Sequence, residues 1–164
     1  QRLRVDCPIG IDHTGRIVSD TVFAFGEYID SVPLPSTYLA APGFYEYDPW
    51  GRIRKITRHF PQSVVTTQEF EYNADGNLSV IKDYYNGMLY NTRTYITYDN
   101  KVSIFRTNKI WMFVSANYSK NNMIAADTYN GKGLPTQFSD PNFNRFMFLH
   151  ETYLGKSTIE YKCK

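Results

Sequence analysis

The sequence predicts an all-β protein, a single domain over residues 1–164 built as an antiparallel meander of roughly eleven or twelve strands. Composition is the first reason, because 42% of the residues are hydrophobic and 14 Tyr and 11 Phe favour sheet over helix. The second is a turn pattern that occurs four times, and the third is the alternation of apolar and polar residues between turns. So many strands favour a strongly curved sheet, a sandwich or a partly closed barrel.

The repeated turn pattern is Asp or Asn, two variable residues and then Gly. In the copy Asp48-Pro-Trp-Gly51, Asp can cap a type I turn and Pro sets φ at the second position. Gly takes the last position, where a positive φ makes a one-residue bulge. Each copy therefore predicts a β-hairpin, and the copies lie at 12–15, 48–51, 73–76 and 130–133.

The expected strands follow these turns along the chain. The first pair covers 3–11 and 16–25, and the proline-rich stretch 26–42 predicts a long loop excursion, because proline removes ladder donors. The hairpins are best defined over 45–102, where 64–72 alternates with the period of two of a half-buried strand. Later strands are expected at 78–85, 88–98, 102–106, 110–116, 123–129, 134–139, 143–152 and 157–163.

One of these segments, 110–116, differs from the others because it is apolar on both faces. A strand of this kind is covered on both sides, so 110–116 is the candidate core strand. No amphipathic helix is expected, apart from a short turn within 36–41.

Charge and hydropathy narrow the classes of partner. The formal charge of +2 is too small to argue for nucleic acid, and none is expected as a partner. No segment approaches the roughly 18 apolar residues that a transmembrane helix requires. The chain begins at Gln1 without a leader, so it is expected to be a processed form or a trimmed piece.

The two cysteines, Cys7 and Cys163, lie near opposite ends of the chain. In a secreted β-protein whose terminal strands meet, they would form one disulfide. The alternative is two unpaired thiols, one at each end, and the spacing carries no metal or redox motif.

The residues that carry catalysis or bind metals form no recognisable motif. His13, His59 and His150 have no partner at ligand spacing, so no metal and no cofactor is expected. Glu69 and Glu71 share a strand face and could act as a glycosidase pair, although alternate carboxylates on a wet face are usually solvated charge. The chain is therefore expected not to be an enzyme.

The most specific binding hypothesis centres on Trp50. At the third turn position an exposed indole beside Tyr45 or Tyr47 would form a flat apolar surface that stacks on a sugar or anchors a protein. The competing interpretation is a Trp folded back over its own hairpin. Arg52 and Arg54 add positive charge that could attract an anionic ligand, or that pairs with acidic residues on neighbouring strands.

Two segments carry a resemblance to a known family. Tyr47-Asp-Pro-Trp-Gly-Arg-Ile53 resembles the core of the tyrosine-aspartate (YD, or Rhs-type) repeat, and Tyr72-Asn-Ala-Asp-Gly-Asn-Leu78 is similar to a degenerate copy. The pattern also resembles small secreted or lipid-anchored Bacteroidetes proteins of unknown function. The resemblance covers 45–102, and the turns are irregularly spaced. It implies hairpin geometry, a secreted, periplasmic or cell-surface location, and a lipid anchor upstream of Gln1.

Together these observations predict an exported, non-catalytic surface module that binds glycan or an envelope protein. A purely structural or self-associating cell-envelope protein is the alternative from a different class. A carbohydrate-active enzyme that uses Glu69 and Glu71 is a weaker alternative.

Overall fold

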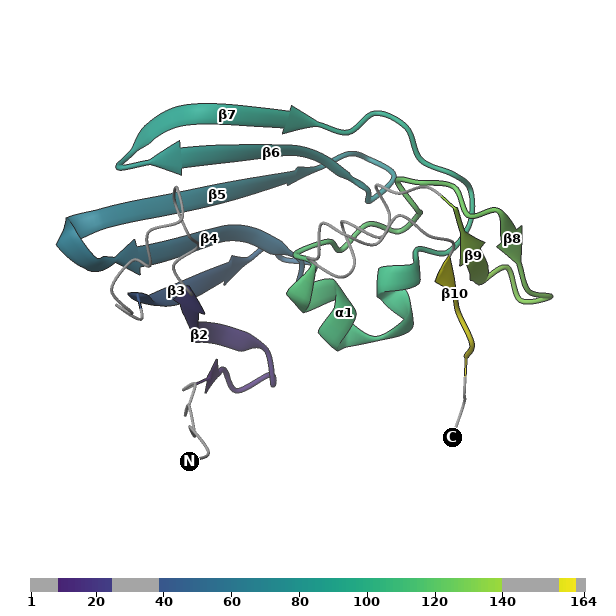
Figure 1. The fold of residues 1–164 in the computed structure, drawn as a ribbon, viewed down its shortest axis with the longest axis horizontal. Helices are drawn as coiled ribbons and strands as arrows, with labels where there is room; N and C mark the ends of the chain where they lie inside the picture. Colours follow the sequence, from purple (N-terminus) through teal and green to yellow (C-terminus); the bar gives the residue numbers. More distant parts are fainter. Residues whose placement is uncertain (1–8, 25–38, 140–156, 162–164) are drawn as a thin grey trace, which may run out of the picture. The chain divides into compact units, whose positions relative to one another are not determined.

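The computed structural model describes residues 9–24, 39–139 and 157–161 (Figure 1). The chain forms two compact units. The first comprises residues 1–70 with 81–93, and the second comprises 71–80 with 94–164. Cys7, Cys163, His150 and the expected strand 143–152 lie outside the described residues, as does most of the proline-rich stretch.

A seven-stranded antiparallel meander is the main element of the fold, with its strands in sequence order (Figure 1). This confirms the mostly β fold and the meander. The described edge strands β1 and β7 do not pair with each other. Neither a closed barrel nor a strong curl is found among the described residues, so the expected strongly curved sheet or partly closed barrel is not confirmed. The strands are β1 Gly10–Ile11, β2 Ile17–Ala24, β3 Leu39–Tyr47, β4 Ile53–Phe60, β5 Val64–Tyr72, β6 Leu78–Tyr85 and β7 Met88–Thr94.

The four turns share one hydrogen-bond pattern. In each turn the Gly N–H donates to the carbonyl of the leading Asp or Asn at 2.9 to 3.0 Å, and Gly φ lies between 72 and 84°. The N–H of the leading residue donates to the carbonyl of the residue after Gly at 2.8 to 2.9 Å. This is the geometry that the turn chemistry predicts, because only Gly adopts this φ without strain.

The proline-rich loop was expected to extend to residue 42, but β3 already begins at Leu39. Leu39 to Pro42 pair with β2, with Thr21 opposite Pro42. A proline fits there because the ladder between β3 and β4 begins only at Gly43, so β3 is paired on one side at this point. The short 3-10 turn Pro61–Ser63 forms the hairpin loop between β4 and β5.

The expected core strand 110–116 is wrong, because the chain forms helix α1, Lys109–Val114 (Figure 1). The Asn108 side chain caps it by accepting a hydrogen bond from the Ile110 N–H at 2.8 Å. The partly buried Met112 packs against the hydrophobic core of the second unit, while Ile110 and Val114 are exposed, so only one side of the segment is covered.

The second unit has a small core beneath a three-stranded antiparallel sheet ordered β10-β9-β8. The strands are β8 Thr128–Tyr129, β9 Pro135–Phe138 and β10 Ser157–Thr158. Their core comprises Ile104, Phe105, Ala126 and Phe138. Ile104–Thr107 is a 3-10 helix and not the expected strand, because its first two side chains turn into this core. The strands expected at 88–98 and 123–129 are shorter than predicted. The described residues contain ten strands, because the expected strands 102–106 and 110–116 are helical instead.

Among the described residues, no helix is long and apolar enough to cross a membrane.

Candidate binding site at two neighbouring hairpin turns

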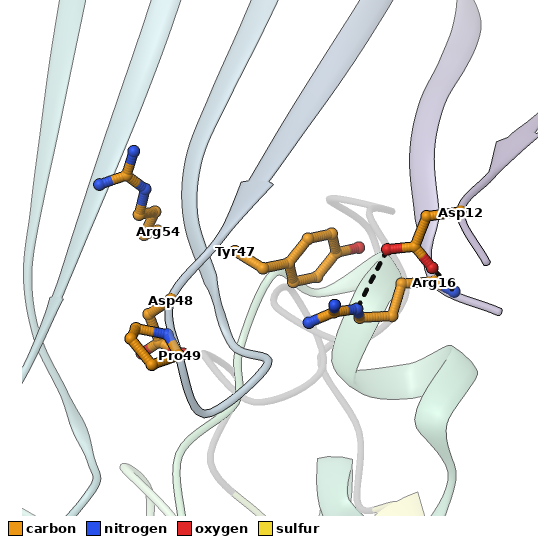
Figure 2. A pocket seen from close by; sticks show the side chains of 6 residues that line it. All are labelled: Asp12, Arg16, Tyr47, Asp48, Pro49 and Arg54. Carbon is orange, nitrogen blue, oxygen red and sulfur yellow. Dashed lines mark hydrogen bonds and ion pairs between the residues drawn. The ribbon is translucent and has the colours of Figure 1, made fainter. Parts of the chain in front are cut away.

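The first and second hairpin turns form one surface in the first unit. The turn that opens β2 and the turn that closes β3 lie at the same end of the sheet, because these two strands are antiparallel neighbours. A side chain at Gly51 would come within 3.5 Å of Arg16 Nη1, so the turns approach each other closely. Between them is an open depression of about 580 Å³ lined by Asp12, Arg16, Tyr47, Asp48, Pro49 and Arg54 (Figure 2).

The first turn is organised by the Asp12 carboxylate. Its Oδ1 accepts hydrogen bonds from the Thr14 hydroxyl at 2.6 Å, the Thr14 N–H at 2.8 Å and the Arg16 N–H at 3.0 Å. The Arg16 Nε lies 3.3 Å from Oδ2 (Figure 2). The Thr14 hydroxyl and then the Arg16 N–H hold the pKa of Asp12 well below its ordinary value. The carboxylate is therefore ionised throughout the physiological pH range.

The second turn repeats this arrangement around Asp48. Its Oδ1 accepts from the Trp50 N–H at 3.0 Å and the Arg52 N–H at 2.9 Å, and its Oδ2 accepts from Arg52 Nε at 2.7 Å. The Arg52 guanidinium lies 5.0 Å from the centre of the Trp50 ring, within cation–π range. Trp50 is 78% exposed, so the indole is held by Arg52 at the tip and does not fold back over its hairpin.

Tyr47 lies between the two turns, and its ring points toward Arg16 and Asp12 (Figure 2). Its hydroxyl donates to the Ile17 carbonyl at 2.6 Å, and the Arg16 guanidinium lies 5.2 Å from the ring centre. Arg54 lines the same depression and forms an exposed ion pair with Glu46 at 2.6 Å. Four of the five expected binding residues, Tyr47, Trp50, Arg52 and Arg54, are therefore at or beside this surface.

The fifth expected residue, Tyr45, is not part of the surface, because it is only 8% exposed. Its hydroxyl donates to Asp20 at 2.7 Å and accepts from Arg58 at 2.8 Å. Burial, and then the bond to Asp20, raises the pKa of the Tyr45 phenol, so it stays protonated. The expectation that this ring flanks Trp50 was wrong, because its hydroxyl is satisfied inside the sheet.

Four lining residues, Asp12, Arg16, Asp48 and Pro49, were missed by reasoning from the sequence. The signal was present, because Asp12 and Arg16 occupy the same turn positions as Asp48 and Arg52. What was missing was the adjacency of the two turns, which depends on β2 pairing with β3 across the proline-rich segment.

The remaining candidates have structural contacts. Glu69 accepts a hydrogen bond from the Tyr84 hydroxyl at 3.0 Å, and Glu71 is exposed. The His59 ring contacts Phe44 edge to face at 5.7 Å, and His13 is exposed at the first turn. No group of three or more His, Cys, Asp or Glu suited to a metal occurs in the described part of the chain.

Comparisons of the chain with protein-family models, curated proteins and solved structures found no match.

Proposed function

We propose that this chain is an exported, non-catalytic module that binds glycans through the two-turn surface. The observation that carries the proposal is the exposed Trp50 indole, held by Arg52 beside a depression lined with carboxylates and guanidinium groups. An indole offers an apolar face to the C–H groups of a sugar ring, and planar charged groups bond well to paired hydroxyls.

The charge pattern favours a neutral sugar over an acidic one. Each arginine at the surface has a carboxylate partner within the site: Arg16 with Asp12, Arg52 with Asp48 and Arg54 with Glu46. An acidic sugar would have to compete with these carboxylates for the guanidinium groups. We therefore expect glycan binding that changes little between roughly 0.05 and 0.5 M salt, because salt screens mainly net charge.

The exported location and the relation to YD-type repeats remain part of the proposal. The relation to YD-type repeats rests on the sequence segments 47–53 and 72–78. The envelope location rests on the resemblance alone.

The test is binding of the purified chain to a panel of neutral and acidic glycans, with Trp50→Ala beside it. We expect a neutral-glycan hit whose affinity falls roughly fivefold or more in the variant, since stacking on an aromatic contributes about 1 kcal/mol or more. Trp111→Ala is the matched control, because Trp111 is 40% exposed on α1, which belongs to the second unit. An equal loss in the control, or no binding by the folded protein, would contradict the proposal.

A further inference from the structure

Strand β7 is a long edge of the sheet, and in the described part of the chain its outer side is unpaired. It is the last strand in the sheet order, and no described strand pairs with its outer side. All seven of its residues are exposed, with Met88 at 69%, Leu89 at 54% and Tyr90 at 65%. An edge of this kind presents a row of backbone N–H and C=O groups that can pair with another strand.

The opposite edge of the sheet does not have this character. Strand β1 has two described residues, and its register with β2 shifts between Gly10 and Ile11. Short edges and bulges are the usual devices that block edge pairing. Strand β7 has neither proline nor lysine, and its single charged residue is Arg93.

The charge on β7 is neutralised within its own sheet. Asp83 on β6 is 3% exposed and accepts from Arg93 Nη2 at 2.9 Å and Nε at 3.2 Å. Asn91 donates to the same carboxylate at 3.0 Å. Two copies of this edge can therefore approach without like-charge repulsion. A charged partner would find no unpaired charge on the edge to bind.

The same contacts hold β7 in a conformation ready to pair. Gln68 on β5 donates to Asp83 at 2.8 Å, so one carboxylate ties three strands together. At the other end of the hairpin, the Asn86 side chain accepts from the Val65 N–H at 2.8 Å, and the Asn86 N–H donates to the Val65 carbonyl at 2.8 Å. A preorganised strand loses less conformational entropy when it binds.

We propose that β7 pairs with β7 of a second copy of this chain, which joins the two sheets edge to edge. Two-fold symmetry makes the two identical strands antiparallel and brings the exposed Met88, Leu89 and Tyr90 of each copy to one interface. Pairing over seven residues buries less than a permanent interface does, so the dimer depends on concentration. This inference is independent of glycan binding.

The test is sedimentation velocity over a dilution series of the wild-type chain and of Leu89→Lys and Tyr90→Lys, which place a charge on opposite faces of β7. We expect wild type to shift from 19.1 kDa toward twice that mass as its concentration rises. Each lysine variant should remain a monomer at concentrations where wild type is mostly dimer. Val114→Lys is the control, because Val114 is equally exposed but lies on α1, and it should dimerise like wild type.

Two outcomes would overturn the inference: a wild type that stays monomeric throughout, or a dimer that both β7 variants leave intact. Circular dichroism and urea unfolding of each variant separate a lost dimer from a lost fold. Both substituted positions are more than half exposed, so the variants should fold. Trp50→Ala should dimerise normally, which keeps this test distinct from that of glycan binding.

Discussion

Gly43 shows how a single residue without a side chain organises three strands. It lies opposite Asp20 on β2 and opposite Arg58 on β4, so these two side chains flank it on one face. They form an ion pair across it at 3.0 Å, and the Tyr45 hydroxyl contacts both. A Cβ at position 43 would lie 2.5 Å from Arg58 Nη1 and 2.6 Å from Asp20 Oδ1.

We therefore expect Gly43→Ala to lower the free energy of unfolding by about 1 to 2 kcal/mol, because the Asp20–Arg58 pair must separate. Urea denaturation at neutral pH measures the change. Gly131→Ala is the control, since a Cβ there meets nothing within 4 Å, and it should leave stability almost unchanged. Equal effects of the two substitutions would show that the close approach does not matter.

Among the elements, the hairpin turns were the most predictable part of the fold. Their bonds join residues no more than four positions apart, so their geometry depends on local sequence. The leading side chain accepts from the N–H four residues later at 2.9 to 3.1 Å in every copy. Asp leads two of the turns and Asn the other two, so the oxygen that accepts this bond is common to all.

This equivalence gives a prediction for the second turn. Asp48→Ala should lower the free energy of unfolding by about 1 to 2 kcal/mol, because it removes the acceptor for Trp50 and Arg52.

Asp48→Asn should lower the free energy of unfolding by less, roughly 0.5 kcal/mol. The amide oxygen still accepts the backbone hydrogen bonds, and only the ion pair with Arg52 is lost. Thermal or urea unfolding of the two variants in parallel measures the difference. If Asp48→Asn lowered the free energy of unfolding as much as Asp48→Ala, the ion pair and not the hydrogen bonds of the turn would stabilise this hairpin.

Helix α1 marks the limit of local reasoning about elements. The segment is apolar on both faces, which describes a covered strand and a short helix equally well. The segment forms a helix because Asn108 caps its N-terminus and Met112 packs against the core of the second unit. Ile159, far away in sequence, packs against the same core, so the pattern within the segment could not decide the outcome.

At the scale of the molecule, Asp99 joins distant parts of the second unit. It accepts from the Tyr129 hydroxyl at 2.7 Å, from the Asn122 amide at 2.9 Å, and from the backbone N–H groups of Lys101 and Asn122, each at 3.0 Å. Burial acts to raise the pKa of Asp99, but these hydrogen bonds together lower it below its ordinary value of 3.8. Folding therefore favours the ionised form of Asp99.

This shift predicts part of the acid sensitivity of the fold. Because the pKa of Asp99 is lower in the folded state than its ordinary value of 3.8, its ionised form stabilises the fold. This contribution to the free energy of unfolding is fully present above pH 3.8 and is lost as the pH falls through the pKa of the folded state. Asp99→Asn should lower the free energy of unfolding at neutral pH by about 1 kcal/mol or more. It should also make stability fall less steeply than in wild type as the solution is acidified.

Urea unfolding at a series of pH values measures both effects. Asp75→Asn is the control at neutral pH, because Asp75 is exposed in the third turn and its replacement should leave stability unchanged there. An Asp99→Asn curve parallel to that of wild type would show that Asp99 does not contribute to the acid response.

The sequence by itself determined the hairpin turns and the antiparallel pairing of the strands that they join directly. Each depends on residues adjacent along the chain, where turn chemistry and strand period act directly. Only the tertiary structure decided that Asp12 and Arg16 complete the site, that Tyr45 is buried, and that 109–114 is helical. Those outcomes depend on which distant segments become neighbours. Strand pairing and core burial bring such segments together only when the whole chain folds.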